Sequence, residues 1–358
     1  MSRHCSFDIA VLGGGPAGLM AALAATKIAR TVLVLDRLPR AEAPFRIDAV
    51  PARTLALLAD FGIDPRAVGA DSLSRGQNAC WETETPRWSD AAPTAHIERP
   101  LLECALFDAL CVDHRAEIVV DRARPYYDRV FGGSGWQAKM LIDSAGRAAV
   151  TAASRIRLQP AWAGRFYWNK RSAAAKATPE FRIVALPHGY AYRLGSARNI
   201  GIGLVGRGQC LNVDPTSALR DMDFLFEDMP ALALMKRGVA GVASVQWSIA
   251  GRTALVGDAS IARDALSSQG LAASLSDGLY AVAAIGSGDS KCLPFRQAEN
   301  LSAHLRLLKQ QIARCRYRAE PTWRAYDRVI DDRNASLVES RKAPALRRGR
   351  VEELPLDT

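Results

Sequence analysis

The 358-residue sequence lacks several features that would place it in common protein classes. No apolar run reaches the roughly 18 residues of a membrane-spanning helix, so we expect no membrane span. The seven cysteines include no Cys-x-x-Cys pair and the five histidines are scattered, which predicts reduced thiols and no metal site. The net charge is +10, but no nucleic-acid-binding module is visible. The lack of such a module predicts no nucleic-acid partner. Because no leader precedes the first predicted strand, we expect a cytoplasmic protein.

A glycine-rich turn near the N-terminus is the most informative feature that is present. The apolar run Ile9 to Leu12 predicts a buried strand, and a helical run and a second apolar strand follow the turn. In such a βαβ unit the glycines let a pyrophosphate reach the helix N-terminus, and an acid after the second strand accepts ribose hydroxyls. The pattern therefore predicts a dinucleotide site that includes Gly13, Gly15, Pro16, Ala17, Gly18, Asp36 and Arg37.

Three later segments resemble FAD proteins of the glutathione-reductase-like superfamily. They are Asp143-Ser-Ala-Gly146-Arg147, the pair Gly257-Asp258 after a short strand, and the turn from Asp264 to Leu271 before a helix. A second Gly-x-Gly-x-x-Gly string, Gly201 to Gly206, falls in the strand-like run Asn199 to Val205 of a predicted hairpin, so we expect no dedicated nicotinamide domain. The resemblance implies FAD as the cofactor, with Asp258 on its ribityl chain. It further implies cofactor contacts from Arg99 at a helix start, Asp143, Gly146, Gly257, Ser267, Ser268, Gly270 and Leu271.

Within that superfamily the sequence is similar to the group-A monooxygenase and tryptophan-halogenase-like branch. The stretch from Phe45 to Leu55 fits this branch, and Ala265 replaces the proline usual in the flavin-facing turn. The halogenase motif Trp-x-Trp-x-Ile-Pro has no match, since the nearest string is Phe166-Tyr-Trp-Asn-Lys170. The short chain is most similar to LodB-type flavoproteins, which mature quinone-cofactor oxidases. That group implies oxygen insertion into a tryptophan of a partner protein during tryptophylquinone biogenesis.

The predicted fold is α/β, with a Rossmann FAD-binding domain, an antiparallel-sheet substrate domain and C-terminal helices. We expect the FAD-binding domain in residues 1–75, 97–160 and 248–290, and the substrate domain in 76–96 and 161–247. Helices follow at 291–340, including one over His304 to Tyr317, and a basic tail occupies 341–358. Apolar residues at helical spacing also predict a helix from Pro215 to Lys236.

Several residues are candidates for catalysis in a site where the flavin itself carries the oxidising chemistry. Arg46 and Asp48 are expected over the flavin ring, with Asp48 either taking an indole proton or forming an ion pair with Arg46. Gln269 is expected at the flavin edge and His188 at the substrate cavity. The expected partners are an oxidase precursor or a small aromatic substrate, and an external reductant for the flavin.

Other functions remain open at this point. A small-molecule aromatic hydroxylase, a halogenase and a geranylgeranyl-reductase-like enzyme share the motifs described above. A flavin-binding interaction protein without catalysis, such as an oxidase chaperone, is a different class with the same cofactor site. Oxygen consumption in the presence of a reductant separates that class from the enzymes.

Overall fold

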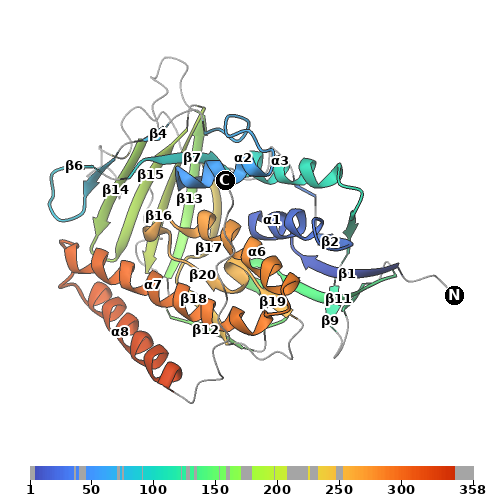
Figure 1. Ribbon diagram of the computed structural model, residues 1–358. Coiled ribbons are helices and arrows are strands. Elements are labelled where there is room, and N and C mark those ends of the chain that lie inside the picture. The colour runs from blue at the N-terminus through green and yellow to red at the C-terminus, as the bar shows by residue number, and fades with distance from the viewer. Residues whose placement is uncertain are drawn as a thin grey trace.

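The architecture was analysed in a computed structural model of the chain. It describes residues 5–35, 38–39, 46–70, 73–74, 76–90, 92–121, 123–125, 130–132, 135–152, 154–158, 162–170, 180–196, 198–207, 225, 233–246 and 253–342. The helices and strands form a Rossmann-like layer, a large antiparallel sheet and a pair of C-terminal helices (Figure 1). These are the three parts of the predicted α/β fold.

The first sheet is largely parallel, and its strands are apolar because both of its faces are covered. Its order is β8-β2-β1-β11-β10-β9, with β19 pairing beside β11. The parallel strands are β1 (Cys5–Leu12), β2 (Thr31–Leu35), β8 (Ala116–Val120), β11 (Trp136–Asp143) and β19 (Thr253–Leu255). Two antiparallel strands, β9 (Ala123–Pro125) and β10 (Val130–Gly132), complete it.

Three helices cover one face of this sheet and form the main core with it. They are α1 (Pro16–Ala25), α3 (Arg99–Cys111) and α6 (Gly270–Gly286). In Figure 1, α1 and α6 lie side by side. They approach closely because Gly278 of α6 has no side chain: a Cβ there would stand 2.6 Å from the Ala17 carbonyl oxygen. The helix α2 (Arg53–Asp60) follows the strand β3 (Ile47–Pro51).

The second large sheet is mainly antiparallel and has the order β17-β13-β16-β15-β14-β5-β6. Its strands are β5 (Gln77–Cys80), β6 (Arg87–Ser89), β13 (Trp162–Lys170), β14 (Glu180–Leu186), β15 (Gly189–Gly195), β16 (Asn199–Arg207) and β17 (Ala233–Val239). The predicted hairpin appears as β15 and β16, which pair in register from Gly189 with Gly206 to Gly195 with Ile200.

Two small sheets connect the large ones. One contains β3 (Ile47–Pro51), β7 (Thr94–Glu98) and β4 (Leu73–Ser74), and its Ile47 and Ala49 pack against Leu194 of β15. The other contains β12 (Ser154–Arg157), β18 (Ala243–Gln246) and β20 (Ile261–Ala262). The first of these sheets therefore places the antiparallel sheet next to the segment that carries Asp48 and Arg99.

The C-terminal helices α7 (Leu293–Arg314) and α8 (Pro321–Lys342) pack against the antiparallel sheet. Trp81, Trp162, Tyr190, Trp323 and Tyr326 fill this interface. The indole nitrogens of Trp81 and Trp323 donate to the Gln311 and Leu186 carbonyl oxygens at 2.8 and 2.7 Å. Among the described helices, none combines the length and the hydropathy that a membrane crossing requires.

Two helix predictions need correction. The helix expected from His304 begins eleven residues earlier, at Leu293, and ends at Arg314. The predicted helix from Pro215 to Lys236 is wrong at its end, because Ala233 to Lys236 begin the strand β17 alongside β13. Apart from Leu225, the rest of that segment lies outside the described residues. Pairing with β13 decides the conformation there, and helical spacing alone does not reveal that partner.

Candidate flavin site

The glycine turn after β1 leaves an open, amide-lined space at the N-terminus of α1. Gly13 adopts φ +102°, and a Cβ on it would stand 2.7 Å from the Ser144 carbonyl oxygen. A Cβ on Gly18 would overlap the Gly13 carbonyl oxygen and the Ser144 hydroxyl. At Gly15, by contrast, a Cβ would meet no atom within 4 Å, and Pro16 starts the helix. Free amides at a helix N-terminus beside open space form a binding site for a phosphate group.

Two other predicted elements meet this turn. A Cβ on Gly257, which has φ +57°, would stand 2.8 Å from Cβ of Ala17. Asp258 therefore lies beside the first turn of α1, within the short 3-10 helix Gly257–Ala259, and its carboxylate is 44% exposed. Gly146 has φ +63° and open space around its Cβ position. These glycines provide the close backbone approach that a dinucleotide requires.

Asp143 shapes the turn after β11 through its own hydrogen bonds. Its carboxylate is fully buried and accepts from the Ala145 amide at 2.9 Å. The amide and the hydroxyl of Thr151 donate to it at 2.8 and 2.7 Å. Both carboxylate oxygens are therefore occupied within the protein. Asp143 thus fixes Gly146 and the Ser144 hydroxyl, which donates to the Leu12 and Gly13 carbonyl oxygens.

Asp48 lies between two arginines rather than facing a substrate as a free base. Nη2 of Arg46 is 3.1 Å from one carboxylate oxygen, and Nε of Arg99 donates to the other at 2.8 Å. Burial alone would raise the pKa of Asp48, but the two guanidinium charges outweigh it and lower the pKa below its ordinary value. A carboxylate with a lowered pKa is a weak proton acceptor. The geometry therefore favours a role for Asp48 in positioning Arg46 and Arg99 over the predicted role of a base.

The predicted flavin-facing turn contains the 3-10 helix Ala265–Ser267 and leads into α6. Ser268 has φ +48°, and a Cβ on Gly270 would meet no atom within 4 Å. The Gln269 side chain is exposed and forms no cap for α6, whereas Leu271 is buried in the main core. The amides of Ser267 and Ser268 donate to the Asp264 and Ala265 carbonyl oxygens, so the first amides of α6 and the Gln269 side chain are what this turn offers to a ligand. The Leu271 side chain is buried and not available.

A buried carboxylate holds this turn in place. One oxygen of Asp264 accepts from the Tyr190 hydroxyl and, at 2.9 Å, from the Leu266 amide. The Tyr326 hydroxyl donates to the other oxygen at 2.9 Å. The Asp264 amide donates to Nε2 of His304 at 3.2 Å. Asp264 therefore joins the turn to β15, α7 and α8.

Burial sets the protonation of this cluster. It is the largest cause of the raised pKa of Asp264 and also raises the pKa of Tyr190, to which the Asp264 charge adds. It lowers the pKa of His304 to about 3, with a smaller contribution from the Arg263 charge. His304 is therefore neutral at physiological pH, which agrees with its Nε2 accepting the Asp264 amide.

The antiparallel sheet reaches the flavin-facing elements through Tyr192 of β15. Burial raises the pKa of Tyr192 to about 12, and the charges of Arg46, Asp48 and Asp264 also act on it. Tyr192 thus lies near both the arginine-clamped Asp48 and the buried Asp264. The sheet expected to carry the substrate and the segments expected to carry the cofactor meet here.

The structure does not bring His188 to this site. His188 lies in the turn between β14 and β15, where its Nδ1 is 3.2 Å from the Thr322 hydroxyl of α8. The opposite end of β15, at Gly195, is the one that contacts β7, through Nδ1 of His96 at 2.6 Å from the Gly195 carbonyl oxygen. His188 is therefore a full strand length from β7, and its catalytic role stays a prediction. Asp36 and Arg37 lie outside the described residues.

Sequence analysis missed the side chains that hold the flavin-facing turn. Tyr190, His304 and Tyr326 are 74, 40 and 62 residues from Asp264 in the sequence. A signal was present, because Asp264 opens the turn and Tyr190 and Tyr326 each carry a hydroxyl that needs a partner when buried. No local pattern, however, shows that these residues meet.

The N-terminal part of the chain matches a known family. Residues 6–153 match the FAD binding domain family. No curated protein matches the sequence. The cofactor is therefore FAD, and the open space at Gly15, Gly146 and Gly270 together with the free helix amides fits a dinucleotide.

Solved structures share the fold over most of the chain. The peptidyl tryptophan dihydroxylase QhpG, essential for tryptophylquinone cofactor biogenesis, matches with a TM-score of 0.70 and 19% identity, covering 90% of this chain and 79% of QhpG. The myxobacterial chondrochloren halogenase CndH matches with a TM-score of 0.71 and 16% identity, covering 95% and 91%. The probable FAD-dependent monooxygenase pqsL from Pseudomonas aeruginosa matches with a TM-score of 0.66 and 13% identity, covering 91% and 100%. Residues 6–153 therefore form an FAD-binding domain, and the chain has the fold of the flavin-dependent monooxygenases and halogenases.

Proposed function

We propose that this protein is a monooxygenase that hydroxylates a tryptophan side chain of a partner protein during tryptophylquinone biogenesis. The observation that carries the proposal is the fold shared with QhpG over 90% of this chain. The net charge of +10 adds support, because it suits a partner with an acidic contact face.

In the proposed site, FAD lies along the glycine turn and α1 and ends at the turn from Ser267 to Gly270. Arg99 is proposed to bind its phosphates, because a planar guanidinium suits phosphate oxygens and Asp48 fixes its orientation. Asp258 is proposed to accept a ribityl hydroxyl. We also propose the domain division given above, in which residues 76–96 and 161–247 form the substrate domain.

Reduced FAD supplies the activation of O₂. The proposed reaction breaks one ring C–H bond and forms a C–OH bond with one oxygen atom of O₂. The other oxygen atom leaves as water, with two protons and two electrons, and the external reductant provides the electrons. The protein's task is to hold the ring against the flavin edge and to exclude water from it. Tyr192 and the backbone of the Ser267 to Gly270 turn are proposed to line this space.

The test supplies the FAD-loaded protein with a reductant, oxygen and one of two substrates. These are an unmodified oxidase precursor that contains tryptophan, and free tryptophan. Mass spectrometry then looks for the mass of one or two added oxygen atoms. The proposal expects modification of the precursor only. If free tryptophan is modified at a rate equal to or higher than that of the precursor, the proposal is wrong and the protein is a small-molecule hydroxylase.

Two further results of the same assay would also overturn the proposal. Addition of bromine or chlorine in the presence of halide would identify a halogenase. Oxygen consumption that stays at the level of free reduced flavin would identify a flavin-binding protein without this activity.

A further inference from the structure

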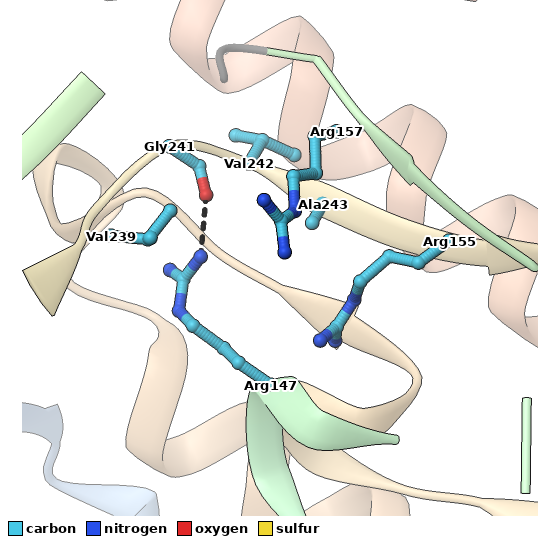
Figure 2. Close-up of a pocket in the computed structure, with 7 residues that line it drawn as sticks. All are labelled: Arg147, Arg155, Arg157, Val239, Gly241, Val242 and Ala243. Carbon is cyan, nitrogen blue, oxygen red and sulfur yellow. Dashed lines mark hydrogen bonds between the residues drawn. The ribbon is translucent and has the colours of Figure 1, made fainter. Parts of the chain in front are cut away.

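A small pocket lies beside the small sheet that contains β12 and β18. Its volume is about 50 Å³. It is lined by Arg147, Arg155, Arg157, Val239, Gly241, Val242 and Ala243. One water needs about 10–15 Å³ on this kind of measure, so the pocket holds a group of several heavy atoms. Figure 2 shows the guanidinium groups of Arg155 and Arg157 directed into the space that Arg147 borders.

Different elements hold these three arginines in place. Arg147 belongs to the 3-10 helix Gly146–Ala148, and its Nη1 donates to the Gly241 carbonyl oxygen at 2.8 Å (Figure 2). Arg155 and Arg157 are two residues apart on β12, so their side chains leave the same face of the strand. A terminal nitrogen of Arg155 donates to the Asp258 carbonyl oxygen, while its buried Nε has no hydrogen-bond partner among the described residues. The pocket is therefore preformed, with an unused buried donor in its wall.

The charges at this pocket do not balance. Among the described residues, Asp258 is the only carboxylate within salt-bridge distance of any of the three arginines, with Oδ2 3.8 Å from Nε of Arg147. Burial is the largest cause of the lowered pKa of both Arg147 and Arg155, and neighbouring arginine charges add to it. The Asp258 charge opposes the shift in both, with Asp264 adding at Arg147 and Asp143 at Arg155. Clustered guanidinium charges are unfavourable unless an anion accompanies them.

We propose that this pocket binds the phosphate or pyrophosphate group of a second small ligand while FAD is bound. Arginine forks present paired donors that match the oxygens of such a group, and a doubly charged anion would offset the excess charge. None of the lining residues belongs to the glycine turn, to α1, to the Ser267 to Gly270 turn or to the Asp48 ion pairs. The pocket is therefore distinct from the proposed FAD phosphate contacts, although Arg147 directly follows Gly146 and its Nε is 3.8 Å from the Asp258 carboxylate.

The test is calorimetric titration of FAD-free and of FAD-saturated protein with sodium pyrophosphate and, separately, inorganic phosphate. The variant is Arg157→Gln, because Arg157 is exposed and its loss should leave the fold intact. The matched control is Arg30→Gln, an exposed arginine just before β2, at the N-terminal end of the parallel strands, whereas Arg147 follows the C-terminal end of β11. Circular dichroism checks that both variants fold. If Arg157→Gln does not fold, Arg155→Lys replaces it, since lysine keeps the charge but loses the paired donors.

The proposal expects saturable anion binding to the FAD-saturated protein. Arg157→Gln should weaken it about tenfold or more, as for loss of a charge-assisted hydrogen bond, and Arg30→Gln should bind as the unaltered protein does. Three results would overturn the proposal. The first is that FAD saturation abolishes the binding, which would assign the arginines to the FAD pyrophosphate. The second is that neither anion binds. The third is that both substitutions weaken binding equally, which would mean general attraction to a basic surface.

Discussion

The glycine turn and the Asp264 cluster flank the same proposed cofactor but are built in different ways. The turn from Gly13 to Gly18 is built from backbone, and its key contacts are close approaches that only glycine permits. The Asp264 cluster is built from side chains of four elements, the turn itself, β15, α7 and α8. The first region depends on residues adjacent in the sequence and the second on tertiary packing. The glycine turn can therefore be predicted from one stretch of sequence, whereas the Asp264 cluster cannot.

The largest effect is expected from Gly18→Ala in the backbone-built region. The added Cβ would overlap the Gly13 carbonyl oxygen and the Ser144 hydroxyl, neither of which can move without disturbing β1. Severe overpacking of this kind costs about 3 kcal/mol, so the free energy of unfolding should fall by that amount. Urea unfolding measures it. Unchanged stability would mean that the turn is not packed as described.

The side-chain-built region should respond to Asp264→Ala with a smaller loss. The substitution leaves the Tyr190 and Tyr326 hydroxyls buried without their acceptor, which costs about 2–3 kcal/mol. The double variant Tyr190→Phe with Tyr326→Phe removes both donors as well. Combined with Asp264→Ala, the triple variant should cost less than the sum of the separate losses, because no hydroxyl remains unpaired. Strict additivity in urea unfolding would contradict the cluster.

Arg99→Gln tests the ion pair that lies between the two regions. Asp48 keeps Arg46 as a partner, so the fold should survive, while FAD affinity should fall about tenfold through loss of a charge-assisted contact. Fluorescence titration with FAD measures the affinity. Asp48→Asn should reproduce part of this loss and leave the pH profile of turnover unchanged. If the acidic limb of the pH profile shifts in Asp48→Asn, Asp48 acts as a base after all.

The effect that is smallest at neutral pH is a pH dependence that separates the neutral His304 from other histidines. Its pKa is lowered to about 3 by burial, so its contribution to stability is complete above the ordinary value near 6.5 and decreases as pH falls toward 3. Each pH unit in that window costs up to about 1.4 kcal/mol. Urea unfolding at several pH values should therefore show a flatter profile for His304→Gln. The exposed His114→Gln should behave as the unaltered protein does, and equal slopes for all three would contradict a buried neutral His304.

Sequence analysis predicted what depends on neighbouring residues. Buried strands such as β1 and β2, the helical run after the glycine turn and the order of the FAD motifs follow from apolar runs and glycine positions, and the structure confirms the α/β fold. The contact of His188 with Thr322 was not predicted, because a hairpin pattern does not show which elements pack against its ends. The second arginine on Asp48 and the partners of Asp264 were missed because they meet only through tertiary packing.

The central claim is that FAD occupies the open space at Gly15. Gly15→Ala tests it most directly, because its Cβ would meet no atom within 4 Å and its φ of −77° suits alanine. The control is Gly238→Ala on β17, where a Cβ also meets no atom within 4 Å. The measurement is FAD affinity by fluorescence titration, with urea unfolding of the FAD-free protein alongside. The account predicts that both variants keep their stability and that only Gly15→Ala loses FAD binding, by about tenfold or more. Equal FAD affinity for Gly15→Ala and the unaltered protein would contradict it.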